Sequence, residues 1–436
     1  MKEQKLTTAN YKGTRDFFPE DMRLRNYLFS VMKQVAISYG YEEYDGPMIE
    51  SLDLYRAKTG EEIVGKQIYN FIDKGGREVA IRPEMTPTVA RMVASKLRDL
   101  PRPIRWFSIP NLWRYEQPGH GRLREHWQLN VDMFGVNHFR AELEIFSLAC
   151  DILFAFGAPR NSFRVKVSHR SLLDEFFKSG LKLKPEQAHE VSKILDKKNK
   201  ITQDEYVALV SKTIPEDPTA VSKIDQFLAA TVENIHTILG LTAETIQKIN
   251  DLFSGLKDLG LADIVDFDPS VVRGFDYYTG FIFEIFDTSP KNKRSLYGGG
   301  RYDNLIGLFS NEELSGIGFG LGDVTLQNFL ETHGLLPNLS NANTVYIPLL
   351  DDASFSSVQS LAKRFRAANV AVDLSLQTQK MGKQLSYAEK KGYRWILILG
   401  EEEIKNQTVT LKDMVHRSQE ELKWDDALQK VRTELS

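Results

Sequence analysis

The stretch from Arg105 to Val136 brings charged and amide side chains to one face of a predicted antiparallel hairpin. Polar and apolar residues alternate near both of its ends, which is the period of a β-strand with one buried face. The polar face carries Arg114, Glu116, Gln128, Asn130 and Asp132. Burying such groups is costly unless each finds a partner, so the pattern indicates a site for a polar ligand. A solvated hairpin with ordinary surface charge is the alternative.

The turn of this hairpin is rich in arginine and glycine. Arg122 and Arg124 follow His120 and lie beside Gly119 and Gly121. A guanidinium offers paired N–H donors that match the oxygens of phosphate or carboxylate, and glycine loosens the backbone around them. The turn therefore favours capture of a phosphate or a carboxylate.

Glu84 and Thr86 lie at a predicted junction between a strand and a helix, in the sequence REVAIRPEMTP. The strand breaks at Pro83, and the helix restarts after Thr86 or Pro87. A carboxylate and a hydroxyl suit an ammonium group, which has three donors and no acceptor. Thr followed by Pro is also an ordinary helix start, and that alternative stays open.

The segment from Ser270 to Phe286 gathers Arg273, Tyr277 and Tyr278 beside Gly274. The segment ends in an alternating strand pattern, and adjacent residues of a strand point to opposite faces. One tyrosine could therefore pack in the core while the other offers its hydroxyl to a ligand. Packing of both tyrosines is the alternative, and spacing alone favours it.

Two of these segments resemble a known family. RYEQPGHGRLREHWQLNVDMFG resembles the second signature motif of class II aminoacyl-tRNA synthetases, in the version that histidyl-tRNA synthetases carry, and RGFDYYTGFIFE resembles their histidine-specific stretch. The resemblance implies that Arg114 and Arg273 are catalytic, holding the α-phosphate of ATP and the histidine carboxylate. Two positioned arginines would stabilise the charge of the forming adenylate.

The resemblance also implies the remaining ligand contacts. RPEMT is similar to the family's stretch that binds the amino group of histidine, through Glu84 and Thr86, and Gln128 would contact the same group. The imidazole would meet Asp132, Tyr277 and Tyr278. The residues implied for ATP are Arg114, Glu116, Arg122 and Arg124.

The activity implied is that of a histidine–tRNA ligase in protein synthesis. ATP and L-histidine would form histidyl-adenylate, with Mg²⁺ assisting and no dedicated metal site in the protein, and the 3′ end of tRNA(His) would take the histidyl group. The alternative is a catalytically silent, histidine-binding paralogue like the regulatory subunit of ATP phosphoribosyltransferase. That paralogue typically lacks the C-terminal domain and erodes the RGFDYY stretch, and both are present here.

The third class II motif departs from the common pattern. Most class II enzymes end it with Gly-X-Glu-Arg, whose arginine stacks on adenine and meets the γ-phosphate. This chain reads Gly322, Asp323, Val324, Thr325, so threonine stands at the arginine position. YGGGRYDNL, just before it, is predicted to be a glycine-rich strand start.

Composition narrows the class of protein. The 436 residues are 42% hydrophobic and 26% charged, with a net charge of −3 and a single cysteine, Cys150. The net charge argues against a generally basic nucleic-acid binder, so RNA contacts must come from local basic patches. One cysteine cannot form an internal disulfide. With no signal-peptide core and no run of roughly 20 apolar residues, a cytoplasmic protein without membrane contact is expected.

The order of elements predicts an α+β catalytic domain with a mixed or antiparallel sheet over residues 1–336. A helix from Pro19, closed by Gly40, and an extended segment with Pro47 resemble the first class II motif, which forms a homodimer interface. Residues from about 171 to 262 read as an all-helical insertion. Basic residues there could touch RNA or simply form a solvated face. They are Lys193, Lys197, Lys198 and Lys200.

After a linker at residues 337–343, residues 344–436 alternate strand and helix as in a doubly wound α/β unit. ILILGEEEIKNQTVTLKDM resembles the C-terminal anticodon-binding domain shared by several class II synthetases. Bases splayed from an RNA loop need stacking and edge hydrogen bonds. Arg394, Lys391 or Lys412 could supply them.

Overall fold

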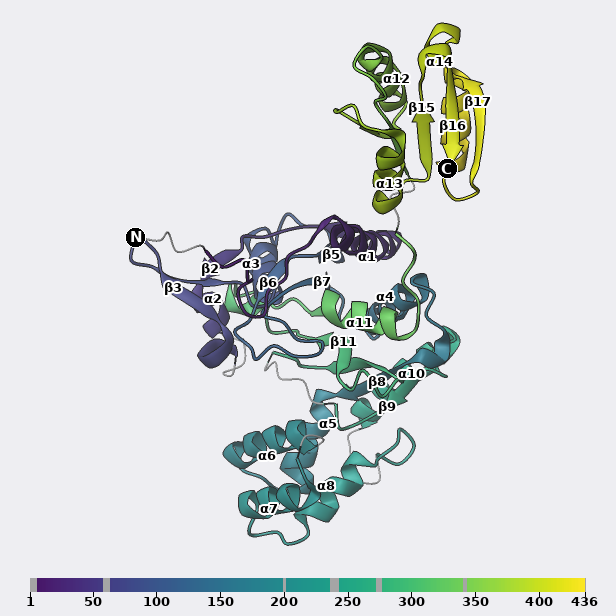
Figure 1. The fold of residues 1–436 in the computed structure, drawn as a ribbon. Helices are drawn as coiled ribbons and strands as arrows, with labels where there is room; N and C mark the ends of the chain where they lie inside the picture. Colours follow the sequence, from purple (N-terminus) through teal and green to yellow (C-terminus); the bar gives the residue numbers. More distant parts are fainter. Residues whose placement is uncertain are drawn as a thin grey trace. The chain divides into compact units, whose positions relative to one another are not determined.

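A computed structural model describes residues 6–57, 63–198, 201–235, 243–271, 277–339 and 343–435. The chain divides into two compact units, Met1–Leu336 and Pro337–Ser436. Within the described residues, the first unit contains a nine-stranded and a three-stranded sheet, and the second contains a five-stranded sheet (Figure 1). None of the described helices is long and apolar enough to cross a membrane.

The nine-stranded sheet is mixed, as predicted. Its order is β1-β5-β7-β12-β11-β10-β8-β9, with β6 also paired to β7. The β1–β5 and β8–β9 pairs are parallel, and the other pairs are antiparallel. The strands are β1 Glu42–Glu43, β5 Ile104–Ser108, β6 Asn111–Trp113, β7 Glu125–Phe134, β8 Phe163–His169, β9 Val265–Phe267, β10 Phe281–Asp287, β11 Ser295–Arg301 and β12 Gly316–Gly322.

The central strand β7 has one apolar and one polar face, as its alternation predicted. Leu129, Val131 and Met133 are buried in a core that includes residues of α1 (Pro19–Ser38), α4 (Arg140–Ala155) and α11 (Asp323–Thr332). The alternate residues point away from that core, because successive side chains of a strand leave opposite faces. α3 (Thr86–Ser95) contributes to a separate core cluster that contains Tyr277 and Tyr302. The polar face of β7 therefore lies between two packed layers.

The glycine run of YGGGRYDNL lies in β11. Gly299 faces Phe319 of β12, and a Cβ added at Gly299 would lie 1.9 Å from the carbonyl oxygen of Gly318. No side chain larger than hydrogen fits such an approach. The run is therefore a closely packed strand.

A small antiparallel sheet positions the Glu84 segment at the polar face of β7. Its order is β2-β4-β3, with bounds Ile49–Ser51, Glu78–Ile81 and Tyr69–Ile72, and α2 (Leu52–Arg56) follows β2. β4 ends at Ile81, before the break predicted at Pro83, and α3 begins at Thr86, one residue before the first of the two predicted starts. Glu84 therefore lies in the short connection between them.

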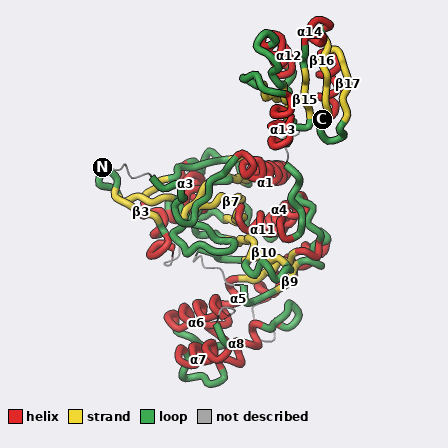
Figure 2. The backbone as a smooth tube through the Cα atoms, in the orientation of Figure 1, coloured by secondary structure: helices red, strands yellow, loops and turns green. Residues whose placement is uncertain are grey.

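The stretch from α5 to α10 is helical, as predicted, and Figure 2 shows helices joined by loops there. The helices are α5 Arg170–Glu175, α6 Pro185–Lys197, α7 Gln203–Thr213, α8 Ala220–Leu228 and α10 Ala243–Asp258. Lys193 pairs with Glu190 and Lys198 with Asp225. Lys200 lies outside the described residues. The two described pairs fit a solvated helix face.

The second unit is an α/β fold around its own core. Its sheet order is β14-β13-β15-β16-β17, with the first three strands parallel and the last two antiparallel. The elements are β13 Thr344–Ile347, α12 Phe355–Ala367, β14 Ala371–Leu374, α13 Met381–Lys391, β15 Trp395–Ile398, α14 Glu401–Asn406, β16 Thr408–Asp413, β17 Ser418–Lys423 and α15 Trp424–Leu435. Arg394 forms ion pairs with Asp413 and Glu434, so it is engaged inside the unit.

Candidate active site

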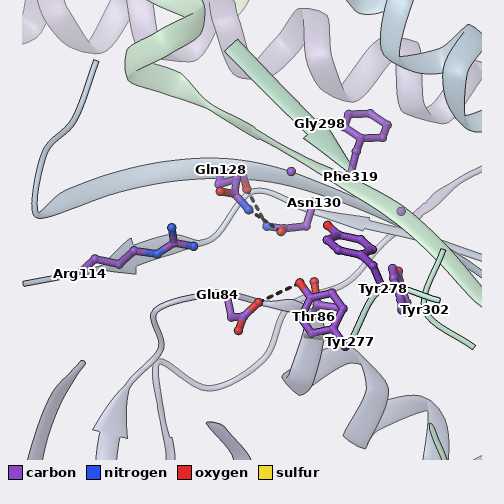
Figure 3. Close-up of a pocket in the computed structure, with 12 residues that line it drawn as sticks. Glu84, Thr86, Arg114, Gln128, Asn130, Tyr277, Tyr278, Gly298, Tyr302 and Phe319 are labelled. Atoms are coloured by element: carbon purple, nitrogen blue, oxygen red, sulfur yellow. Dashed lines mark hydrogen bonds between the residues drawn. The ribbon is translucent and has the colours of Figure 1, made fainter. Parts of the chain in front are cut away.

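Two adjoining cavities lie along the polar face of β7. The smaller, of about 130 Å³, is lined by side chains from the α3 start, β7, the Tyr277 segment and β12 (Figure 3). The larger, of about 350 Å³, extends toward the hairpin turn and the α11 start. Arg114, Gln128 and Gly320 line both cavities. Two ligands placed in the two cavities would therefore meet at these residues.

The smaller cavity contains a buried carboxylate at the start of α3. Glu84 is 2% exposed, and the Tyr277 hydroxyl donates to its Oε2 at 3.1 Å. Thr86 lines the cavity beside it (Figure 3). A buried carboxylate needs a donor or a cation, so this corner can receive an ammonium group.

Tyr277 and Tyr278 both line the smaller cavity, with ring centroids 4.9 Å apart. The prediction that they point to opposite faces of a strand is wrong, because both precede β10, which begins at Phe281. Burial raises the pKa of Tyr277 well above its usual value of 10, so its hydroxyl stays a donor. Both alternatives for the pair hold in part, since the tyrosines pack on the core cluster and also form the cavity wall.

Gln128 and Asn130 enter the cavity from β7 and brace each other. The Gln128 Nε2 donates to Asn130 Oδ1 at 2.8 Å, and the Asn130 Nδ2 donates to the Gln128 carbonyl at 3.0 Å. Both bonds are drawn in Figure 3. This mutual pairing fixes the amide of Gln128 at the boundary of the two cavities.

Asp132 lies behind the cavity wall and is not part of the lining. It is 2% exposed, and the Tyr302 hydroxyl, which does line the cavity, donates to its Oδ1. Its Oδ2 has no hydrogen-bond partner among the described residues. Burial raises the pKa of Asp132 to about 7. The contact of Asp132 with the cavity thus passes through Tyr302, which the sequence interpretation missed.

Arg114 follows β6 and forms part of the wall between the cavities. Its Nε donates to the Pro83 carbonyl at 2.9 Å, which ties the hairpin to the Glu84 segment. Figure 3 shows its guanidinium pointing toward Gln128. Arg273, the second arginine predicted to be catalytic, lies outside the described residues.

The larger cavity is lined mainly by polar and charged residues. Arg122 forms an ion pair with Glu116, with its second nitrogen 2.6 Å from Glu116 Oε1, and both residues line the cavity as predicted. Burial and the guanidiniums of Arg114, Arg15 and Arg122 lower the pKa of His126 to about 3. His126 is therefore a neutral imidazole in this wall.

Arg124 lies elsewhere, and no described cavity includes it. Its guanidinium lies over the Tyr115 ring at 4.0 Å, donates to the Tyr11 hydroxyl at 2.9 Å and donates to the Glu116 carbonyl at 3.0 Å. The Gly13 carbonyl accepts from the backbone of Arg124 as well. Arg124 therefore ties the hairpin turn to the N-terminal segment, and its contact with ATP stays a prediction.

The residues of the third motif join strands to α11. Asp323 accepts from Arg15 at 2.7 Å and from the Trp127 backbone at 3.0 Å. Thr325 donates its hydroxyl proton to the Leu296 carbonyl at 2.7 Å. Within the described ranges, no group of three or more His, Cys, Asp or Glu residues could hold a metal ion.

Two families match the chain in sequence. A family described as histidyl-tRNA synthetase matches residues 13–324, and one described as anticodon binding domain matches residues 344–434. The chain is 77% identical over 436 residues to a histidine–tRNA ligase of Leptospira biflexa serovar Patoc, covering 100% of both. It is 35% identical over 413 residues to a histidine–tRNA ligase of Thermoplasma volcanium, covering 94% of this chain and 95% of that protein.

Solved structures share the fold. A histidyl-tRNA synthetase from Nostoc sp. PCC 7120 superposes with a TM-score of 0.82 at 23% identity, covering 99% of this chain and 100% of that one. The apo histidyl-tRNA synthetase of S. aureus superposes with a TM-score of 0.74 at 24% identity, covering 98% and 100%. These likenesses extend over both units.

Proposed function

The chain belongs to the histidyl-tRNA synthetase family and is a histidine–tRNA ligase, and we propose that its smaller cavity binds L-histidine and its larger cavity binds ATP. The observation that carries this assignment is the shared wall formed by Arg114, Gln128 and Gly320. Histidine and ATP must approach within bonding distance at one point. Two cavities that meet at an arginine supply such a point.

Adenylate formation at this wall is an in-line displacement. A carboxylate oxygen of histidine attacks the α-phosphorus, and the bond from that phosphorus to the pyrophosphate oxygen breaks, so that pyrophosphate leaves. Negative charge grows on the phosphate oxygens during this step, and we propose that the Arg114 guanidinium stabilises it. Arg273 is proposed to add a second cation there, on the strength of the family resemblance.

Histidine recognition divides between the two ends of the smaller cavity. We propose that Glu84, Thr86 and Gln128 receive the ammonium group, whose three donors match their acceptor oxygens. The imidazole is proposed to lie against Tyr277, Tyr278 and the pair formed by Tyr302 and Asp132. An apolar isostere of histidine would leave these polar groups without hydrogen-bond partners, and this cost is the basis for selectivity.

Mg²⁺ is proposed to accompany ATP. Glu116 and Glu284 both line the larger cavity, and a site of one or two carboxylates plus phosphate oxygens is typical of Mg²⁺. These two residues would hold the ion, which neutralises phosphate charge when bound. Arg122, paired with Glu116, is proposed to contact the nucleotide beside them.

The second half-reaction transfers the histidyl group to a terminal ribose hydroxyl of tRNA(His), releasing AMP. The match of residues 344–434 to an anticodon-binding domain supports recognition of this tRNA. We propose that the protein is located in the cytoplasm. A homodimer is also proposed. Apolar residues exposed on and beside the small sheet could pack against a second copy: Met48, Ile49, Phe71 and Ile72.

The histidine site can be tested with Glu84→Gln. This change keeps the volume of the side chain but removes the charge that faces the ammonium group. We expect the KM for histidine in pyrophosphate exchange to rise by about 10-fold or more while the KM for ATP stays unchanged. An equal rise in both values would place Glu84 outside the histidine site.

A further inference from the structure

Thr325, at the place of the third-motif arginine, is used to fix β11. Its hydroxyl bonds the Leu296 carbonyl at 2.7 Å and the Gly322 carbonyl at 3.1 Å. Its methyl group lies near Gly121 of the hairpin turn, since a Cβ added at Gly121 would lie 3.5 Å from it. Thr325 thus joins the α11 start to the strand that follows Arg294.

Arg294 lies beside Thr325 and lines the larger cavity with it. The two residues also line a small neighbouring cavity together with His120 and Asn292. The Arg294 side chain is exposed, and it forms no hydrogen bond or ion pair with any residue in the described part of the chain. A guanidinium is therefore available to a ligand in this cavity.

The loop that carries Arg294 is held in place by Asn292, which is 6% exposed. The Asn292 Nδ2 donates to Asp287 at 2.7 Å and to Thr332 of α11 at 3.1 Å. Its Oδ1 lies 2.8 Å from the Nε2 of His120 in the hairpin turn. The backbone on both sides of Arg294 is thus anchored, at Asn292 and at Leu296, which reduces the entropy cost of placing its side chain on a ligand.

The charges that line the larger cavity indicate which ligand group the Arg294 guanidinium could bind. The lining carries three arginines, Arg114, Arg122 and Arg294, against two carboxylates, Glu116 and Glu284. Arg122 is ion-paired with Glu116, and His126 is neutral. Among the described lining residues the positive charges therefore exceed the negative ones by one, and without Arg294 they would be equal. The triphosphate of ATP carries several negative charges, so it needs such a cation.

We propose that Arg294 binds the β- and γ-phosphates of ATP, in place of the arginine that the third motif lacks. The proposal rests on the assignment of ATP to the larger cavity. Thr325 acts as a positioning residue, because it holds the strand that presents Arg294. The cation then comes from the loop before β11 in place of the helix α11, while the cavity that it lines is the same.

The test compares Arg294→Ala and Arg294→Lys with Lys291→Ala, which removes an exposed lysine of the same loop outside the cavity linings. Calorimetry measures the Kd of ATP and of AMP for each folded variant, and pyrophosphate exchange gives the KM of ATP and of histidine. We expect Arg294→Ala to weaken ATP by about 10- to 100-fold, with AMP and histidine unchanged. Lysine should restore part of the loss, because it keeps the charge but not the paired donors.

Three results would overturn the proposal. They are unchanged ATP binding by Arg294→Ala, an equal loss for ATP and AMP, which would assign Arg294 to the nucleoside, and an equal loss in Lys291→Ala. Calorimetry needs no turnover, so these results are separate from failure of the proposed function. A wild-type protein that binds ATP without histidine-dependent exchange would contradict the function and leave the Arg294 test intact.

Discussion

At the residue scale, the proposed catalytic group is Arg114, because it lines both cavities. Replacing it by alanine would remove a charge that is proposed to act mainly in the transition state. We expect Arg114→Ala to lower the rate of adenylate formation by on the order of 10²-fold or more, with a much smaller change in histidine affinity. Single-turnover kinetics and histidine titration measure the two effects.

Arg98→Ala is a suitable control for this experiment. Arg98 is an exposed arginine, with 89% of its side chain accessible, and it lines neither cavity. It should leave both quantities unchanged. A normal rate in Arg114→Ala would remove Arg114 from the catalytic step.

Asp132 gives a prediction about pH. Burial raises its pKa to about 7, against about 3.9 for an unfolded aspartate. The folded protein therefore holds the proton more tightly, so this contribution to stability is full below about pH 4 and is lost as the pH rises through about 7. Asparagine does not ionise, so Asp132→Asn should melt at a higher temperature than the ligand-free wild type at about pH 8.

The same comparison at about pH 4 should show the two proteins nearly equal, because Asp132 is then protonated in the folded state and about half protonated in the unfolded state. Thermal unfolding of both proteins across this range measures the difference. A difference in melting temperature that does not change with pH would show that the folded protein does not raise the pKa of Asp132.

The residues that line the site could be predicted from sequence where a suitable residue type stands in an element whose pattern is clear. Gln128 lines the smaller cavity on a strand whose alternation is clear in the sequence, and Glu84 lines it from the junction that Pro83 marks between a strand and a helix. Tyr302 was missed, since it follows the end of β11, where no alternation indicates the side-chain direction. Arg124 and Arg294 show the same limit, because an arginine in a loop can turn to the ligand or away from it.

At the scale of elements, the close approach of β11 and β12 forms the floor of the site. Gly299→Ala should lower the free energy of unfolding by about 2 kcal/mol or more, because its Cβ would lie 1.9 Å from the Gly318 carbonyl oxygen. Gly307→Ala is the matched control, with no atom within 4 Å of the added Cβ. Its effect should stay within about 0.5 kcal/mol. Equal stability of the two variants in denaturant titrations would mean that the strands can separate without cost.

The periods of strands and helices predicted several elements, including β7, α3 and the helices between α5 and α10. Pairing across the sheet was not predictable in the same way. β7 lies between β5 and β12, and the β12 residues are about 190 positions further along the chain, since Gln128 pairs with Gly322. Local alternation indicates a strand and its buried face, but the partner is chosen by packing of the whole unit.

At the scale of the whole molecule, we expect the first unit alone to catalyse the first half-reaction, the formation of histidyl-adenylate. The residues proposed to bind histidine and ATP all precede Pro337, and the second unit has a core of its own from Val345 to Val431. We expect Met1–Leu336 to form histidyl-adenylate while its charging of tRNA falls sharply. Circular dichroism and light scattering must first show that this fragment is folded and has the assembly state of the full chain.

Two results of the truncation would contradict this division of labour. Loss of histidine-dependent exchange in a folded fragment would mean that the second unit supports adenylate formation. Normal tRNA charging would mean that the second unit contributes nothing to tRNA recognition.

The most direct test of the central claim is ATP–pyrophosphate exchange by the full chain with each of the twenty amino acids in turn. The two-cavity site predicts exchange with L-histidine and none above background with the others, because only histidine satisfies both the Glu84 corner and the Tyr302 wall. A folded protein that binds histidine but supports no exchange would contradict the account and would favour a regulatory histidine-binding protein.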